Sequence, residues 1–117
     1  MRSAPMRALL SLTATLALAS ACRAADEPAY TRTEDVIYGR KDGMVLTLDV
    51  FRPKSHTNGA GIILVVSGGF FSSHEAINPA FVRPLLDRDY TVFAVVHGSQ
   101  PRYTVPEIVR DVNRAVR

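Results

Sequence analysis

Two glycines that directly follow an apolar run are the feature of this sequence best suited to binding a ligand through its backbone. Residues 61–71 read GIILVVSGGFF, so five large apolar residues end abruptly in Ser67-Gly68-Gly69. A short run that is apolar on both faces and rich in β-branched residues predicts a central strand buried on both sides of a parallel sheet. Glycine lets the chain turn sharply and leaves no Cβ between a ligand and the backbone amides. Open α/β sheets bind ligands beyond the carboxyl ends of such strands, so we expect a site there.

Two of the three histidines, His74 and His97, are candidates for further members of that site. His74 follows the glycines and, with Glu75, is placed to touch a substrate. His97 follows the apolar run 90–96, so it either lines the same site or bonds the nearby backbone. The spacing of His56, His74 and His97 fits no zinc pattern, so we predict no metal.

The elements that must position these residues begin with an antiparallel hairpin. Residues 34–39 are predicted as a strand, and Lys41-Asp42-Gly43 is a turn signal. Residues 44–51 alternate, with Leu46, Leu48 and Val50 on one face, and Arg52-Pro53 ends that strand.

A helix, a strand and a second helix follow residues 61–71. The first helix should begin at Asn78-Pro79, contain Pro84 and bury Phe81, Val82, Leu85 and Leu86, and Asp89 should adopt a left-handed stop after it. Residues 90–96 are a second apolar strand, parallel to the first and with an unpaired edge in a chain of this length. Thr104 and Glu107 predict a capping box for the second helix. Its periodicity is still running at Arg117, which indicates a truncated chain.

The motifs resemble those of the α/β-hydrolase superfamily over residues 34–117. Ser67-Gly68-Gly69-Phe70 is similar to the His-Gly-Gly-Gly or His-Gly-Gly-Trp segment of esterases and lipases, with Ser67 in place of histidine. Residues 85–92 resemble the usual L-L-x-R-G-Y-x-V, with Asp89 in place of glycine. Residues 100–107 and 111–116 resemble the loop and helix after strand four. The match is to acetyl-xylan and feruloyl esterases and to hormone-sensitive-lipase-like carboxylesterases. The expected fold class is therefore α/β, the N-terminal portion of an α/β-hydrolase.

The resemblance implies a serine hydrolase that cleaves an ester by acyl transfer, without a metal or organic cofactor. The backbone amides of Gly68, Gly69 and Phe70 would form the oxyanion hole. The nucleophile of this fold sits in G-x-S-x-G, which this sequence lacks, because Gly98-Ser99-Gln100-Pro101 has no second glycine. We therefore expect a fragment that is inactive alone. The alternative is a non-catalytic secreted binding or accessory protein with an α/β-hydrolase-like start.

The first 25 residues have the layout of a secretory signal peptide, with Arg2 and Arg7 before a short apolar run. Cleavage could follow Ala21, Ala24 or Ala25, and a packed N-terminal helix is the alternative reading. Cys22 offers another route, a lipid anchor, which would be the chain's contact with a membrane. We thus expect a signal peptide over 1–25, a linker over 26–33 and the hydrolase domain over 34–117, in a secreted or periplasmic protein.

Charge and cysteine content exclude several classes of protein. The fourteen basic residues include Arg2, Arg7 and Arg23, so the eleven that remain balance the eleven acidic residues. No basic cluster is interleaved with aromatics, so no nucleic-acid partner is expected. A single cysteine allows no intramolecular disulfide. The expected partner is a small-molecule or carbohydrate-linked ester.

Overall fold

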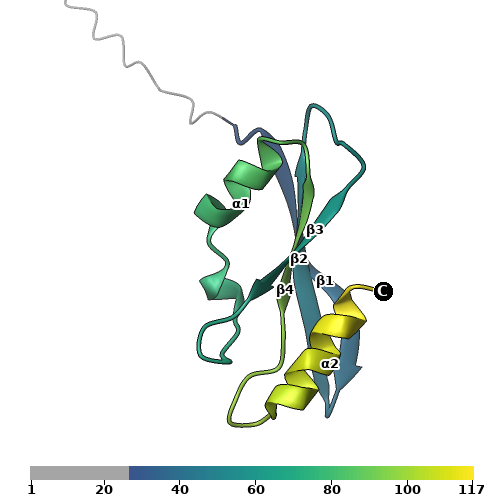
Figure 1. Ribbon diagram of the computed structural model, residues 1–117, viewed down its shortest axis with the longest axis vertical. Helices are drawn as coiled ribbons and strands as arrows, with labels where there is room; N and C mark the ends of the chain where they lie inside the picture. The colour runs from purple at the N-terminus through teal and green to yellow at the C-terminus, as the bar shows by residue number, and fades with distance from the viewer. Residues whose placement is uncertain (1–26) are drawn as a thin grey trace, which may run out of the picture.

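A four-stranded mixed sheet with a helix on each face makes up residues 27–117, the part of the chain that the computed structural model describes (Figure 1). The expected signal peptide and Cys22 lie outside this part. In chain order the elements are β1 (Tyr30–Lys41), β2 (Met44–Pro53), β3 (Gly61–Val66), the 3₁₀ turn η1 (His74–Ala76), α1 (Pro79–Leu86), β4 (Thr91–Val96) and α2 (Val105–Ala115). Neither helix of the described residues has the length and apolar character needed to cross a membrane.

The hairpin is the predicted one, but its first strand is longer. β1 begins at Tyr30, which pairs with Pro53, so residues 30–33 lie in the sheet although they were expected in a linker. The pattern underestimates β1 because its outer face is exposed and polar, while backbone pairing with β2 continues. Asp42 and Gly43 both have positive φ, 47° and 76°, as a two-residue hairpin turn of type I′ requires.

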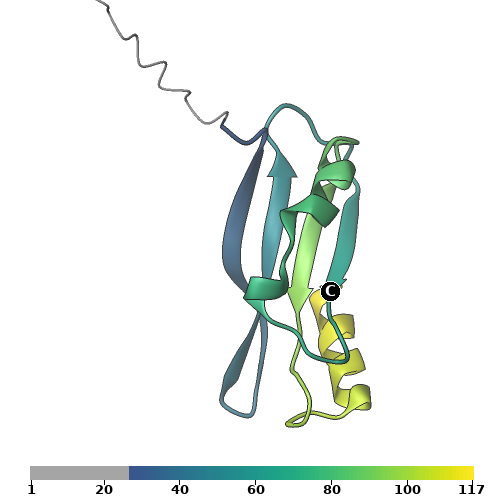
Figure 2. The same ribbon diagram turned by 90° about the vertical axis from the view of Figure 1, so that its left-hand side faces the viewer.

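The strand order is β1-β2-β4-β3, which corrects the prediction that β3 is central and that β4 has an unpaired edge. The crossover through α1 places β4 between β2 and β3, antiparallel to the first and parallel to the second (Figure 2). Val92, Ala94 and Val95 are consequently inaccessible to solvent. Among the described strands β3 has an open outer edge, and its Val65 is 41% exposed. In residues 27–117 the edge strands are β1 and β3, so the aggregation hazard that we expected for β4 applies to these two strands.

The first helix begins and ends as the sequence predicts, although it buries a narrower face. The Asn78 side chain accepts from the Ala80 amide at 2.9 Å, and Pro84 is accommodated inside α1. Val82 and Leu86, one helical turn apart, pack on Phe51 of β2, while Phe81 is 70% exposed. Adjacent helical residues point about 100° apart, so Phe81 cannot share the face of Val82 and Leu86.

The second helix is attached to the sheet by a charged contact. The Glu107 carboxylate accepts from the backbone amide and hydroxyl of Thr104, both at 2.8 Å, and so caps the start of α2. Asp111, 2% exposed, accepts from Lys41 Nζ at 2.6 Å and from the Gly98 amide at 3.1 Å. This buried carboxylate connects α2 with the end of β1 and with the loop after β4.

Nearby, the Tyr38 hydroxyl donates to the Val96 carbonyl at 2.7 Å. Burial, reinforced by the charge of Asp111, raises the pKa of Tyr38 well above its ordinary value. The phenol therefore stays protonated as a donor and fixes the end of β4 against β1.

Replacing Asp89 by glycine should stabilise the protein. Asp89 has φ of 64°, as predicted for the residue that stops α1, and a left-handed backbone is strained for any residue with a Cβ. Its carboxylate contributes a 3.6 Å contact with exposed His56, which is worth little. We expect D89G to raise the free energy of unfolding by about 0.5 kcal/mol and D89A to lower it by a similar amount, measured by urea denaturation. A D89G variant less stable than D89A would contradict this account.

Candidate active site at the carboxyl ends of β3 and β4

The predicted glycine loop is an exposed tight turn at the carboxyl end of β3. Gly68 and Phe71 form an isolated antiparallel bridge, with N–H···O distances of 2.9 and 3.0 Å in the two directions. Gly69 and Phe70 between them have positive φ, 57° and 65°. These values describe a type I′ turn, for which glycine suits the first central position and a residue such as phenylalanine is strained at the second.

The turn decides which predicted oxyanion donors are available. The Gly68 amide already donates to the Phe71 carbonyl. Among the described residues the amides of Gly69 and Phe70 have no acceptor. A Cβ built on Gly68 or Gly69 would meet no atom within 4 Å, so the space around the turn is open. An oxyanion hole needs donors that aim at one point, and the amides of Gly69 and Phe70 are the ones available for that role among the described residues. The oxyanion role of Gly68, Gly69 and Phe70 stays a prediction.

His74 begins η1, just beyond the turn, and contacts the β1–β2 hairpin. Its Nε2 lies 2.7 Å from Thr47 Oγ1 and 3.2 Å from Asp35 Oδ1, and its Nδ1 lies 3.4 Å from Asp49 Oδ1. Asp49 is inaccessible to solvent, and its other oxygen accepts from Arg32 at 2.6 and 2.8 Å. The predicted substrate-binding histidine thus belongs to a polar cluster on the hairpin, in which its side chain is 34% exposed, between buried Asp49 and exposed Asp35.

The same cluster offers three atoms that a metal ion could use, although no histidine spacing in the sequence indicated one. One ligand atom each from Asp35, Asp49 and His74 lies within 4.8 Å of the others. The guanidinium of Arg32 already supplies a positive charge to Asp49, so a cation would have to compete with it. We therefore describe the cluster as an ion-pair network and propose no metal.

His97 lies directly after β4 and is buried, with 4% of its surface exposed. Its Nδ1 lies 2.7 Å from the Gly98 carbonyl, which can only accept, so Nδ1 carries a hydrogen and donates it. Its Nε2 is buried and has no partner among the described residues. Of the two roles predicted for His97, the bond to nearby backbone is therefore present, and Nε2 is left without a partner in the described part of the chain.

A cavity of about 480 Å³ brings both predicted histidines together. His74 and His97 line it, with Thr47, Val96 and Tyr103 among the other lining residues. Glu75 lies at its edge, and hydrogen bonds from its own backbone amide and from the Ser73 hydroxyl lower its pKa below the ordinary value. The prediction that β3 and β4 deliver their loops to one site is consistent with this geometry.

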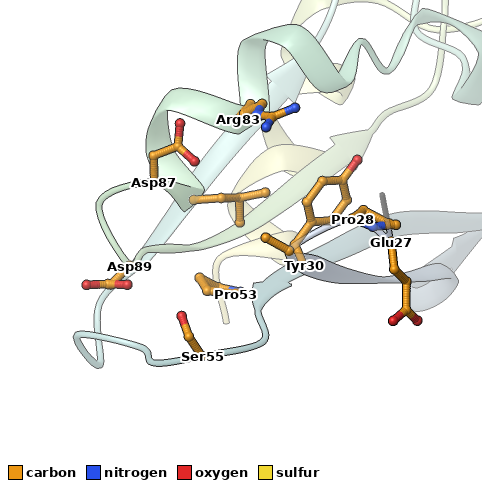
Figure 3. A pocket seen from close by; sticks show the side chains of 10 residues that line it. Glu27, Pro28, Tyr30, Pro53, Ser55, Arg83, Asp87 and Asp89 are labelled. Atoms are coloured by element: carbon orange, nitrogen blue, oxygen red, sulfur yellow. The ribbon is translucent and has the colours of Figure 1, made fainter. Parts of the chain in front are cut away.

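A second cavity, of about 550 Å³, lies at the opposite edge of the sheet (Figure 3). The cavity lies near the start of β1, the end of β2 and the segment before β4. Its lining includes Tyr30, Pro53, Arg83 and Asp89. It is slightly larger, but it lies at the amino ends of β3 and β4, far from the glycine turn. Because ligands of open α/β sheets bind at the carboxyl ends, we place the candidate site in the first cavity, which Ser72 and Ser73 line directly after the turn. Residues 67–71 do not line that cavity, and Ser67 and Gly68 line a separate hollow of about 320 Å³ between β3 and α1.

Comparison with known proteins identifies the architecture. No family model and no curated protein matches the sequence. Among solved structures, esterase B from Lactobacillus rhamnosis aligns with a TM-score of 0.63 and 20% identity over 81% of this chain. The esterase of Pyrobaculum calidifontis aligns with 0.62 and 24% over 76%, and a bacterial heroin esterase with 0.56 and 19% over 78%.

The chain has the fold of the N-terminal part of an α/β-hydrolase. The strand order, the antiparallel hairpin and the flanking helices all agree with the expected fold class. The aligned region spans 32%, 29% and 30% of those three esterases, so the chain covers about a third of each. At sequence identities below 25% the structural alignments establish the shared fold alone, and any activity has to be argued from the residues of this chain.

Sequence reasoning missed the hairpin cluster although one signal was present. Asp49 is a carboxylate inside an otherwise apolar alternating strand, and a charge in such a position is usually paired. Its partners could not be read, because Asp35 reaches it only through a β-bulge between Thr33 and Val36 and a left-handed backbone, φ 56°. The bulge changes the face to which the following residues point.

Removing the buried carboxylate of this cluster should cost much more stability than removing an exposed one. Arg32 pairs with solvent-inaccessible Asp49 and also, at 3.2 Å, with Glu34, whose side chain is 62% exposed. We expect D49A to lower the free energy of unfolding by about 3 kcal/mol, because it removes the buried partner of Arg32 and of the Asp35 amide. E34A is the matched control and should change it by less than about 0.5 kcal/mol. Equal losses in urea denaturation would show that Asp49 is not the centre of the cluster.

Proposed function

We propose that residues 27–117 supply the oxyanion donors of a serine esterase. The supporting observation is the type I′ turn at the carboxyl end of β3, whose Gly69 and Phe70 amides are free to donate. Backbone donors placed where negative charge develops stabilise a tetrahedral intermediate by about 3 kcal/mol each. The α/β-hydrolase fold supports the same assignment, since the structural neighbours named above are esterases.

In the proposed reaction a serine attacks the carbonyl carbon of an ester and the carbonyl oxygen becomes an oxyanion. The amides of Gly69 and Phe70 donate to that oxygen while the alcohol departs and an acyl-enzyme forms. Water then releases the acid. The sequence has no G-x-S-x-G motif, so the proposal assigns the serine, its histidine and its acid to a longer protein that contains these 117 residues. The aligned esterases are about three times the length that this chain covers.

The substrate side of the proposal follows from the cavity of about 480 Å³ that begins at Ser72, the residue after the turn. Its lining combines apolar Val96 and Tyr103 with polar Thr47, which suits a small-molecule or carbohydrate-linked ester with an apolar body and polar groups. No metal or organic cofactor is part of the mechanism. His74 and His97 are assigned to the wall of this cavity.

Secretion is the second part of the proposal and rests on the sequence of residues 1–25. A short apolar segment after Arg2 and Arg7 supports export, and Cys22 supports a lipid anchor as the alternative. Mass spectrometry of the mature protein distinguishes them. A free N-terminus after Ala21, Ala24 or Ala25 indicates signal-peptidase cleavage, a lipid-modified Cys22 indicates an anchor, and an intact Met1 excludes export.

The activity is tested on the full natural reading frame that contains these residues. We expect hydrolysis of short p-nitrophenyl esters and covalent labelling by a fluorophosphonate serine probe. A sequence G-x-S-x-G in frame after codon 117 would supply the labelled serine. If the folded protein shows no turnover and no labelling, the esterase proposal is rejected and the non-catalytic binding or accessory protein is favoured.

A further inference from the structure

The hydroxyl of Ser72 lies between the ends of β3 and β4. Val66 and Val96 are the last paired residues of these two parallel strands. Just beyond them, Ser72 Oγ donates to the Val66 carbonyl at 2.5 Å and accepts from the His97 amide at 3.1 Å. A side-chain oxygen thus takes the place of the next backbone pairing at the point where the two strands diverge.

The backbone of Ser72 is joined to a second serine on the loop after β4. The Ser72 amide donates to Ser99 Oγ at 2.9 Å, and Ser99 Oγ donates back to the Ser72 carbonyl at 3.1 Å. One residue further, the Gln100 amide donates to the Phe70 carbonyl at 3.2 Å. We call Ser72 and Ser99, with these four side-chain bonds, the serine clasp.

The turn that carries the free amides has few other attachments. Residues 67–71 are all exposed, and the bridge between Gly68 and Phe71 lies within the turn itself. Phe70 has a left-handed backbone, which is strained for a residue with a Cβ and persists only where the surroundings hold it. Ser72 follows the turn directly, so the clasp fixes the point at which the turn rejoins the protein.

We propose that Ser72 and Ser99 are positioning residues that hold the Gly69 and Phe70 amides in the orientation needed to bind an oxyanion. The inference rests on the proposed esterase function. It explains how the loop is supported although Ser67 stands where the resembling esterases have histidine. It also gives Ser99, which is not in a nucleophile motif, a role in the site.

The test compares Ser72→Ala and Ser99→Ala in the full-length protein. If the clasp positions the donors, each variant should lower kcat for p-nitrophenyl acetate by about 10- to 100-fold while KM stays within about 3-fold, because the donors act mainly on the transition state. Ser72→Thr retains the hydroxyl and should stay within about 3-fold of the wild-type kcat. Ser55→Ala, an exposed serine at the opposite edge of the sheet, is the matched control and should leave kcat and KM unchanged.

Hydrogen exchange provides a readout that does not depend on activity. Peptides covering residues 67–72 should exchange faster in Ser99→Ala than in the wild type, whereas peptides from α1 should be unchanged. Ser99→Ala keeps the Ser72 hydroxyl bridge between the strands, so it remains informative if Ser72→Ala fails to fold.

The outcomes separate the two proposals. Variants with wild-type kcat and unchanged hydrogen exchange would overturn the clasp. The same conclusion would follow if the loss of kcat matched the loss of thermal stability and Ser72→Thr did not restore kcat. A wild-type protein that neither hydrolyses esters nor reacts with the probe overturns the esterase. The exchange of residues 67–72, measured without substrate, still decides whether the clasp holds the turn.

Discussion

The divergence of β3 and β4 beyond Val66 and Val96 is the constraint on which the rest of the site depends. Up to that pair the strands are parallel neighbours, and the backbone groups are used within the sheet. Beyond it each chain must find other partners, and the two loops find them in each other through Ser72, Ser99 and Gln100. The two loops line one cavity, and within residues 27–117 the turn that precedes Ser72 leaves the Gly69 and Phe70 amides without an acceptor. This edge of the sheet is where open α/β sheets bind their ligands.

Buried charges attach the surrounding elements to that edge. Asp49 pairs with Arg32 and approaches His74, so the start of η1 is held against the hairpin. Asp111 pairs with Lys41 and accepts from the Gly98 amide, so α2 and the loop after β4 are held against the end of β1. Each carboxylate connects segments that are distant in sequence, and removing either one would take the buried partner from a cation and from a backbone amide.

Some of this arrangement follows from local sequence. Four local features depend on neighbouring residues alone, and each is found as predicted. They are the Asp42-Gly43 turn, the Asn78 cap, the left-handed Asp89 and the Thr104–Glu107 cap. The parallel pairing of β3 with β4 follows from the order strand, helix, strand. Hydrophobic periodicity was less reliable for burial, since Phe81, Val109 and Val116 belong to apolar patterns and are exposed in residues 27–117.

Sequence by itself therefore determined the elements, the fold class and the two loops that share the carboxyl edge, because propensity, capping and chain order are local properties. Tertiary structure decided that β4 lies between β2 and β3, that the Gly68 amide is occupied while the Gly69 and Phe70 amides are free, and that Ser72 meets Ser99. These facts depend on hydrogen bonds between residues that are far apart in the sequence, such as Ser72 and Ser99, which are 27 residues apart. No local pattern encodes that pairing, since it exists only once the strands have assembled.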